Sequence, residues 1–165
     1  GTFPGKGIEH WGPKLVNIIS DVKFSLNGIN PEINENLMCG ANTQKQLHNI
    51  ERFIQMRNET GSKATVTLQC TFMKSNLDEL KNIIAWAIEH GVNRVKGHHL
   101  WKTSDALDCE MLRTQENAAL WNQTCEDCHK IADGKVKDKG PKERIFPQLM
   151  GEFSENCGFR GKEDK

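Results

Sequence analysis

The stretch Lys63–Met73, KATVTLQCTFM, alternates strictly between apolar and polar side chains. A period of two is typical of a β-strand, because successive side chains of a strand point to opposite faces of its sheet. The apolar face would carry Ala64, Val66, Leu68, Cys70 and Phe72, and the polar face Thr65, Thr67, Gln69 and Thr71. The stretch therefore predicts a strand with one buried face and one polar face.

Two further strands flank this one along the chain. Residues 22–28, VKFSLNG, form a β-rich run closed by an Asn-Gly turn, and residues 92–101, VNRVKGHHLW, form a third run. Apolar residues at helical spacing separate the three runs. Strand, helix, strand, helix and strand in this order predict an α/β fold with three parallel strands and right-handed crossovers.

The starts of the two intervening helices carry a recognisable spacing. Thr43-x-x-Gln46 matches a capping box, in which two side chains satisfy the first free N–H groups of a helix, and Asn76-x-x-Glu79 marks the start of the second helix. We therefore expect helices to begin at Thr43 and at Asn76.

The polar face of the central strand distinguishes between two architectures. Parallel strands covered by helices on both faces are usually apolar throughout, so a polar face favours the wall of a (β/α) barrel around a wet or occupied lumen. Three strands leave an open edge, whereas a full eight-stranded barrel takes about 250 residues. We interpret the chain as a fragment, a partial TIM-type barrel followed by an irregular C-terminal extension.

Bulk charge and hydropathy exclude several classes of partner. The 22 basic and 22 acidic residues give a formal net charge of zero, so nothing draws the chain toward nucleic acid or an anionic membrane. No apolar run approaches the roughly 20 residues of a membrane span, and the first residues lack a signal-peptide pattern. We therefore expect a cytoplasmic protein without nucleic-acid or membrane partners.

Cys125-x-x-Cys128-His129 has the spacing of a c-type haem attachment site. On a predicted helix over residues 114–132, both cysteines share a face with Trp121, where they could act as small apolar side chains. A haem electron carrier therefore stays open as an alternative function. A second alternative is an α/β binding module without catalysis.

Candidate functional residues follow from the position of the strand ends. In a (β/α) barrel, functional side chains gather at the carboxyl ends of the strands. By that rule the candidates are Ser25, Asn27, Gln69, Thr71, His98, His99 and Leu100. Adjacent residues of a strand face opposite ways, so at most one of the two histidines faces a lumen.

Two long segments, residues 22–40 and 67–100, resemble the second half of the catalytic barrel of radical S-adenosylmethionine enzymes. The resemblance lies in a strand ending Ser-Leu-Asn-Gly, an Asn-x-x-Glu-Leu helix start, a Gly-Val helix end and a following strand. LRTQENAALWN at residues 112–122 resembles the helix after the barrel. CGFRGKE at residues 157–163 resembles the start of the cysteine-rich extension in the SPASM branch of that family.

The resemblance implies a function and a set of site residues. Such enzymes reductively cleave S-adenosylmethionine at a [4Fe-4S] cluster, and the resulting 5′-deoxyadenosyl radical abstracts hydrogen, here from a peptide or protein substrate. Flavodoxin or ferredoxin would supply the electron. Ser25 matches a serine at the cofactor's polar end, Leu100 a position near the adenine, and Gln69 a further contact to cofactor or substrate. Cys157 matches the first ligand of an auxiliary iron–sulfur cluster.

The chain departs from the family pattern in what it lacks. Neither the Cys-x-x-x-Cys-x-x-Cys loop that holds the cluster nor the Gly-Gly-Glu segment occurs in the sequence. The resemblance places both upstream of Gly1, so we expect the fragment to be inactive alone. Residues 1–133 would form the C-terminal half of the barrel, and residues 134–165 a connector and the start of the extension.

Overall fold

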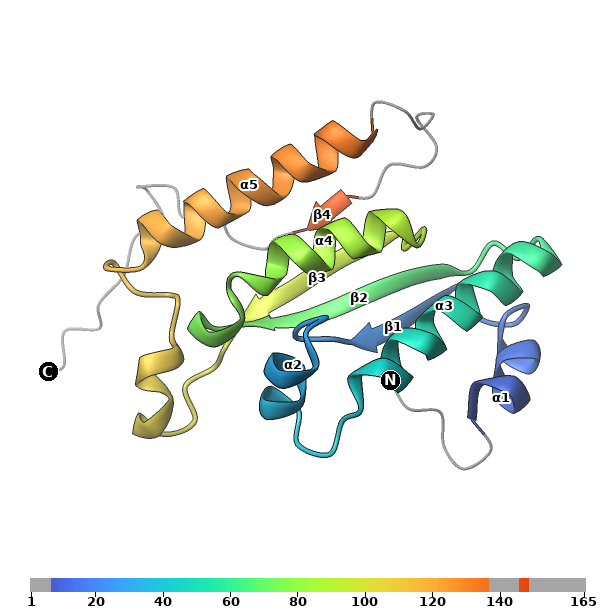
Figure 1. Ribbon diagram of the computed structural model, residues 1–165, viewed down its shortest axis with the longest axis horizontal. Coiled ribbons are helices and arrows are strands. Elements are labelled where there is room, and N and C mark those ends of the chain that lie inside the picture. The colour runs from blue at the N-terminus through green and yellow to red at the C-terminus, as the bar shows by residue number, and fades with distance from the viewer. Residues whose placement is uncertain (1–6, 137–145, 149–165) are drawn as a thin grey trace, which may run out of the picture.

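The computed structural model describes residues 7–136 and 146–148, and these form a parallel sheet with its main helices on one side (Figure 1). The elements, in chain order, are α1 Gly7–Leu15, β1 Asp21–Ser25, α2 Pro31–Leu37, α3 Thr43–Thr60, β2 Thr65–Phe72, the 3-10 turn η1 Lys74–Asn76, α4 Glu79–Glu89, β3 Arg94–His99, the 3-10 turn η2 Asp105–Glu110, α5 Ala118–Val136 and β4 Phe146–Gln148.

The strands lie in the order β1-β2-β3-β4, and each neighbouring pair is parallel. The α/β class and the three expected parallel strands are therefore confirmed. The short strand β4 was not predicted, because its three residues include a proline and carry no alternating pattern. It pairs with the first half of β3, where Arg94 lies opposite Phe146.

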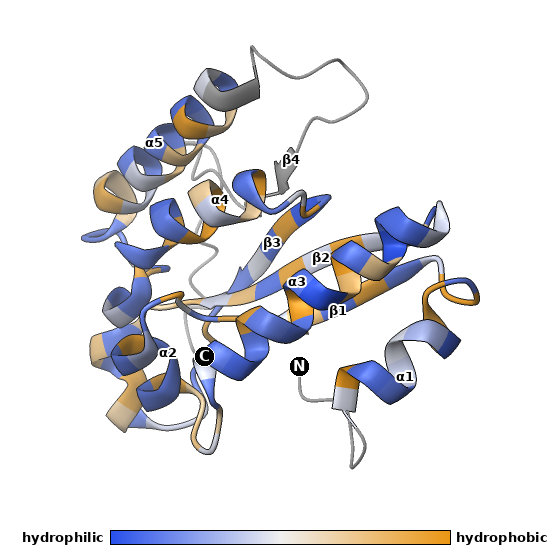
Figure 2. Cartoon of the chain, turned by 45° about the vertical axis from the view of Figure 1, so that its right-hand side comes forward, coloured by the Kyte–Doolittle hydropathy of each residue, from blue (hydrophilic) through white to orange (hydrophobic). Residues whose placement is uncertain are grey.

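The apolar face of the sheet is covered by helices α3, α4 and α5. The ring of Phe24 on β1 packs edge-on against Phe53 of α3, and the ring of Phe72 on β2 lies 4.8 Å from that of Trp121 on α5. Figure 2 shows hydrophobic and hydrophilic residues alternating along the strands. The alternation predicted for the central strand is thus the basis of the core.

The expected capping box at the start of α3 is wrong, although α3 does begin at Thr43. The N-cap is Asn42, whose side chain accepts a hydrogen bond from the N–H of Lys45. Thr43 and Gln46 are instead buried, and both accept hydrogen bonds from the side-chain amide of Asn34, at 3.0 and 2.8 Å. A buried amide group needs hydrogen-bond partners. Because the side chains of Thr43 and Gln46 accept from Asn34, they do not cap the end of the helix.

Helix α5 encloses the two cysteines of the haem-like motif. Cys125 and Cys128 are 2% and 0% exposed, on the same face as the fully buried Trp121. Burial raises the pKa of Cys128 to about 11, so its thiol stays protonated at neutral pH. Thiols enclosed between packed helices have no room for a porphyrin, and the geometry therefore favours a packing role over haem attachment.

The C-terminal predictions fall largely outside the described residues. Helix α5 begins at Ala118 rather than at Thr114. The side-chain amide of Asn117 donates hydrogen bonds to the carbonyl oxygen of Met111 and to the hydroxyl of Thr114, and these bonds hold the preceding residues in a turn. Cys157 lies outside the described residues, and the division at residue 133 stays a prediction. In the described part of the chain, no helix has the length and apolar character needed to cross a membrane.

Gly97 on β3 is the residue whose replacement tests this packing. A Cβ atom at Gly97 would clash with the ring of Phe72 and lie 2.5 Å from the carbonyl oxygen of Cys70. We expect Gly97→Ala to lower the free energy of unfolding by roughly 1–3 kcal/mol through overpacking, as measured by urea denaturation. Gly134→Ala is the matched control: it lies in α5 with nothing within 4 Å and should be neutral or stabilising. Equal effects of the two changes would contradict the packing described.

Candidate functional site

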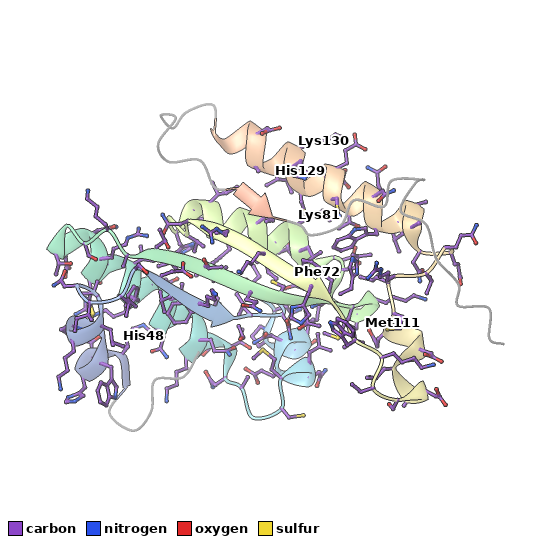
Figure 3. The ribbon with its side chains drawn as sticks, turned by 180° about the vertical axis from the view of Figure 1, so that it is seen from behind. His48, Phe72, Lys81, Met111, His129 and Lys130 are labelled. Carbon is purple, nitrogen blue, oxygen red and sulfur yellow. The ribbon has the colours of Figure 1, made fainter. Side chains whose placement is uncertain are left out.

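One face of the sheet is polar and carries no helix in the described part of the chain. Seen from behind in Figure 3, the strands lie in front of helices α3 and α4. By strand alternation this open face carries Asp21, Lys23, Ser25, Thr65, Thr67, Gln69, Thr71, Arg94, Lys96 and His98. Lys23, Ser25 and His98 are exposed, and most of the others are half-buried. The polar face expected for the central strand is therefore present and accessible.

The three residues singled out for a cofactor share this open face. Ser25 lies directly beside Gln69 in the register of β1 and β2. The N–H of Leu100 donates to the carbonyl oxygen of Phe72 at 3.1 Å, which continues the β2–β3 ladder by one residue. Leu100 therefore keeps the same face as His98, and it lies four residues beyond Lys96, the register partner of Gln69, so the three residues share the open face over about 13 Å along the strands.

The polar groups of Ser25 and Gln69 are free to bind a ligand. Ser25 is exposed and Gln69 half-buried, and within the described residues neither the hydroxyl nor the side-chain amide has a hydrogen-bond partner. Each group offers both a donor and an acceptor. Leu100, half-buried and about 13 Å farther along the same face, adds an apolar surface.

Asn27, another candidate at the strand end, has a structural role instead. Its side-chain oxygen accepts a hydrogen bond from the N–H of Thr71, and its own N–H donates to the side-chain oxygen of Asn34, both at 2.9 Å. The side-chain amide of Asn76 donates to the carbonyl oxygens of Asn27 and Thr71. These bonds tie the loop after β1 to the loop after β2.

Glu79 completes this connection, and the helix start expected at Asn76 is wrong. Its Oε2 atom accepts hydrogen bonds from the N–H groups of Ile29 and Asn30, at 2.8 and 2.9 Å. Its Oε1 atom accepts one from the side chain of Asn82. Helix α4 begins at Glu79, after the turn η1, rather than at Asn76. The nearly buried carboxylate is thus stabilised by donors from the loop about 50 residues earlier.

Three cations on the open face, Lys23, Arg94 and Lys96, were not predicted from the sequence. Lys23 and Arg94 lie in one row, on either side of Thr67. Lys96 lies beside Gln69 in the next row. The signal was present in RVKGHH of β3, where basic residues occupy alternate positions. The sequence prediction considered only the carboxyl ends of the strands, and Arg94 and Lys96 lie before the end of β3.

The single carboxylate among the open-face residues is already satisfied. Burial raises the pKa of Asp21, but hydrogen bonds from Thr65 and Thr67, at 2.7 and 2.9 Å, together with the charges of Arg94 and Lys23, lower it further, so the pKa lies below its usual value. The carboxylate therefore stays charged near neutral pH and is occupied by the two threonines.

The two histidines of β3 point in opposite directions, as expected. His98 is exposed on the open face, whereas His99 packs against the rings of Phe72 and Trp121, with centroids 5.7 and 4.5 Å away. Burial, and then the charges of Arg113 and His98, lower the pKa of His99. His99 therefore belongs to the core and is not a candidate at the open face.

The described residues contain no group of three or more His, Cys, Asp or Glu side chains that could hold a metal ion. The hydroxyl, amide and charged groups of the polar face are suited to hydrogen bonding and to charge recognition.

Comparisons with known proteins identify the fold. No family model matches the sequence, and no curated protein does. Two solved structures of SuiB from Streptococcus suis are similar, both at 12% identity. One covers 84% of this chain and 29% of SuiB with a TM-score of 0.60. The other, SuiB bound to S-adenosylmethionine, covers 87% of this chain and 32% of SuiB with a TM-score of 0.61. The chain spans about a third of the solved structures it matches, and it shares the fold of that part.

Glu79 allows a test of the connection between the two loops. Glu79→Gln can keep its amide oxygen on the N–H groups of Ile29 and Asn30, but it removes the charge that strengthens these bonds and sets its NH2 group against the side-chain NH2 of Asn82. We expect a loss of about 1–3 kcal/mol in the free energy of unfolding, measured by urea denaturation. Asp78→Asn, a change at the exposed neighbouring residue, should be nearly neutral. If both changes are neutral, the connection contributes no stability.

His99 predicts a pH dependence of stability. Its pKa is lower in the folded state than the ordinary 6.5, so the unfolded state binds more protons as the pH falls through 6.5. Stability is complete above that value and declines below it, with a slope of at most about 1.4 kcal/mol per pH unit. His99→Phe should reduce this slope in denaturation measured between about pH 7.5 and 5.5. His48→Gln, at an exposed histidine of α3, should retain it; indistinguishable slopes for all three proteins would contradict the assignment.

Proposed function

We propose that the chain is part of the catalytic barrel of a radical S-adenosylmethionine enzyme and that its open face binds this cofactor at the carboxyl edge. One observation carries the proposal. Ser25, Gln69 and Leu100, which the sequence resemblance selects from three separate strands, share the open face, with Leu100 about 13 Å beyond the row of Ser25 and Gln69.

The chemistry of these residues suits the proposed ligand. S-adenosylmethionine carries an amino acid end, with an ammonium and a carboxylate, and an adenine ring. The free hydroxyl of Ser25 and the amide of Gln69 can donate to the carboxylate and accept from the ammonium. The side chain of Leu100 offers the apolar contact that an adenine face requires. The shared fold with SuiB, solved with S-adenosylmethionine, supports the same assignment.

When bound, S-adenosylmethionine supplies a sulfonium carbon–sulfur bond whose reductive cleavage yields a radical for hydrogen abstraction. The contribution of this chain is to orient the ligand by Ser25 and Gln69 and to cover the adenine with Leu100. The described residues do not fit the [4Fe-4S] cluster, since they contain no suitable ligand group. The described residues therefore contribute to ligand binding and orientation and not to holding a cluster.

Other parts of the proposal rest on the sequence resemblance alone. They are the [4Fe-4S] cluster held upstream, the auxiliary cluster beginning at Cys157, and a peptide or protein substrate. An electron donor such as flavodoxin or ferredoxin and a cytoplasmic location belong to the same group. The second candidate function, an α/β binding module without catalysis, is favoured by the absence of a metal-ligand group among the described residues.

Binding of S-adenosylmethionine to the chain tests the proposal directly. Titration followed by two-dimensional NMR of the 18.7 kDa protein should shift resonances around Ser25, Gln69 and Leu100 first. Ser25→Ala and Gln69→Leu should each weaken binding about two- to ten-fold, because each removes a hydrogen-bonding group. Ser20→Ala, just before the other end of β1, and Gln44→Leu, on the exposed side of α3, are the matched controls.

Two outcomes would contradict this assignment. One is saturable binding whose shifts lie away from the carboxyl edge. The other is the absence of any shift at millimolar ligand, which would favour the binding module without catalysis.

A further inference from the structure

Strand β3 carries a row of basic side chains on the open face. Arg94, Lys96 and His98 occupy alternate positions and therefore share this face, while Val95 and Gly97 between them are buried on the other side. This row is unusual in a chain whose formal net charge is zero. The acidic residues that balance it lie elsewhere, so the open face has a local positive potential.

In the described part of the chain, the cations of the open face have a single carboxylate near them, that of Asp21, which interacts with Arg94 and Lys23 by charge. Within the described residues, Lys23, Arg94 and Lys96 form no ion pair and no side-chain hydrogen bond. Asp21, the only carboxylate among the open-face residues, is held by the hydroxyls of two threonines. Its charge moderates the potential near Lys23 and Arg94 but leaves their donors free.

Some cations on the helical side of the molecule behave differently. Arg52 of α3 pairs with Glu9 at 2.7 Å, and Lys130 of α5 pairs with Glu126 at 2.8 Å. Lys130 lies on the outer helix in Figure 3. Other cations outside the open face, such as Lys45 and Lys74, likewise form no ion pair among the described residues, so what distinguishes β3 is that its basic side chains share one face. Donors left open in this way are available to an external anion.

The spacing of the row indicates which kind of anion fits. Residues two apart on a strand are about 6.6 Å apart, so the three basic side chains extend over about 13 Å. One phosphate group is much smaller than this distance. Carboxylates on alternate residues of an extended peptide repeat at the same interval of about 6.6 Å, and thus match the row one to one.

We propose that the basic row of β3, with Lys23, binds an extended acidic peptide segment that carries carboxylates on alternate residues. The proposal rests on the proposed function, in that it gives the peptide substrate of that site a chemical character. Thr71 lies beside His98 in the register and can donate or accept a hydrogen bond with the peptide backbone. Gln69, the proposed cofactor contact, lies beside Lys96, so the peptide passes next to the cofactor position.

Fluorescence anisotropy with a defined peptide tests this inference on the whole chain. The probe is the dye-labelled peptide Ser-Glu-Ser-Glu-Ser-Glu-Ser, and the matched probe has Gln in place of each Glu. At low ionic strength we expect the acidic peptide to bind measurably tighter than its Gln counterpart. The double variant Arg94→Gln, Lys96→Gln should weaken binding of the acidic peptide roughly five-fold, as expected for two partly exposed charge pairs.

A charge-matched control separates the row from net charge. Lys45→Gln together with Lys130→Gln removes the same charge from the helical side and should leave the affinity unchanged. Circular dichroism confirms folding, and Lys23→Gln, at an exposed position, replaces the double variant if the latter does not fold. Equal binding of the two peptides, or equal weakening by the control pair, would overturn the inference. Tighter binding of single-stranded DNA of similar length would overturn it in favour of a nucleic-acid partner.

The result is independent of the cofactor assignment. Peptide affinity is measured without S-adenosylmethionine, and cofactor binding is followed on the same variants by NMR. Loss of peptide recognition with intact cofactor binding refutes only the acidic-peptide inference. Peptide recognition without cofactor binding supports the basic row and refutes the proposed cofactor site.

Discussion

The carboxylate of Glu79 is the interaction on which the geometry of the open face depends. A nearly buried carboxylate is costly unless donors surround it, and Ile29, Asn30 and Asn82 supply three of them. Two of these donors are backbone N–H groups of the loop after β1. Satisfying the charge at the start of α4 therefore fixes the loop that follows Ser25. The arrangement of this edge therefore depends on hydrogen bonds between the Glu79 carboxylate and a loop about 50 residues earlier in the sequence.

Polar residues near this edge fall into two groups with different roles. Asn27, Asn76 and Glu79 are engaged by hydrogen bonds to backbone groups, and each of them holds one loop against another. Ser25 and Gln69 lie within the same edge but keep their side chains free in the described part of the chain. A saturated network positions the loops rigidly, which allows the free groups to face a ligand without collapsing onto the protein.

Local pattern predicted the fold better than it predicted the side-chain roles. The period-two alternation of residues 63–73 gave the central strand and its open face, because alternation is a property of the backbone itself. The capping box of Thr43 failed because its hydroxyl is taken by Asn34, which belongs to another helix. Likewise, Glu79 finds its partners about 50 residues away. Such choices depend on which segments meet in space, and no local spacing encodes them.

The same distinction explains why the basic row was missed. A net charge of zero describes the whole chain, whereas recognition depends on which charges share a face. Strand alternation sorts Arg94 and Lys96 to one side, where Asp21 is the only carboxylate among the described open-face residues. A net charge of zero therefore argues only against charged partners that contact the whole surface of the molecule. A partner confined to one strand meets a positive surface on a neutral protein.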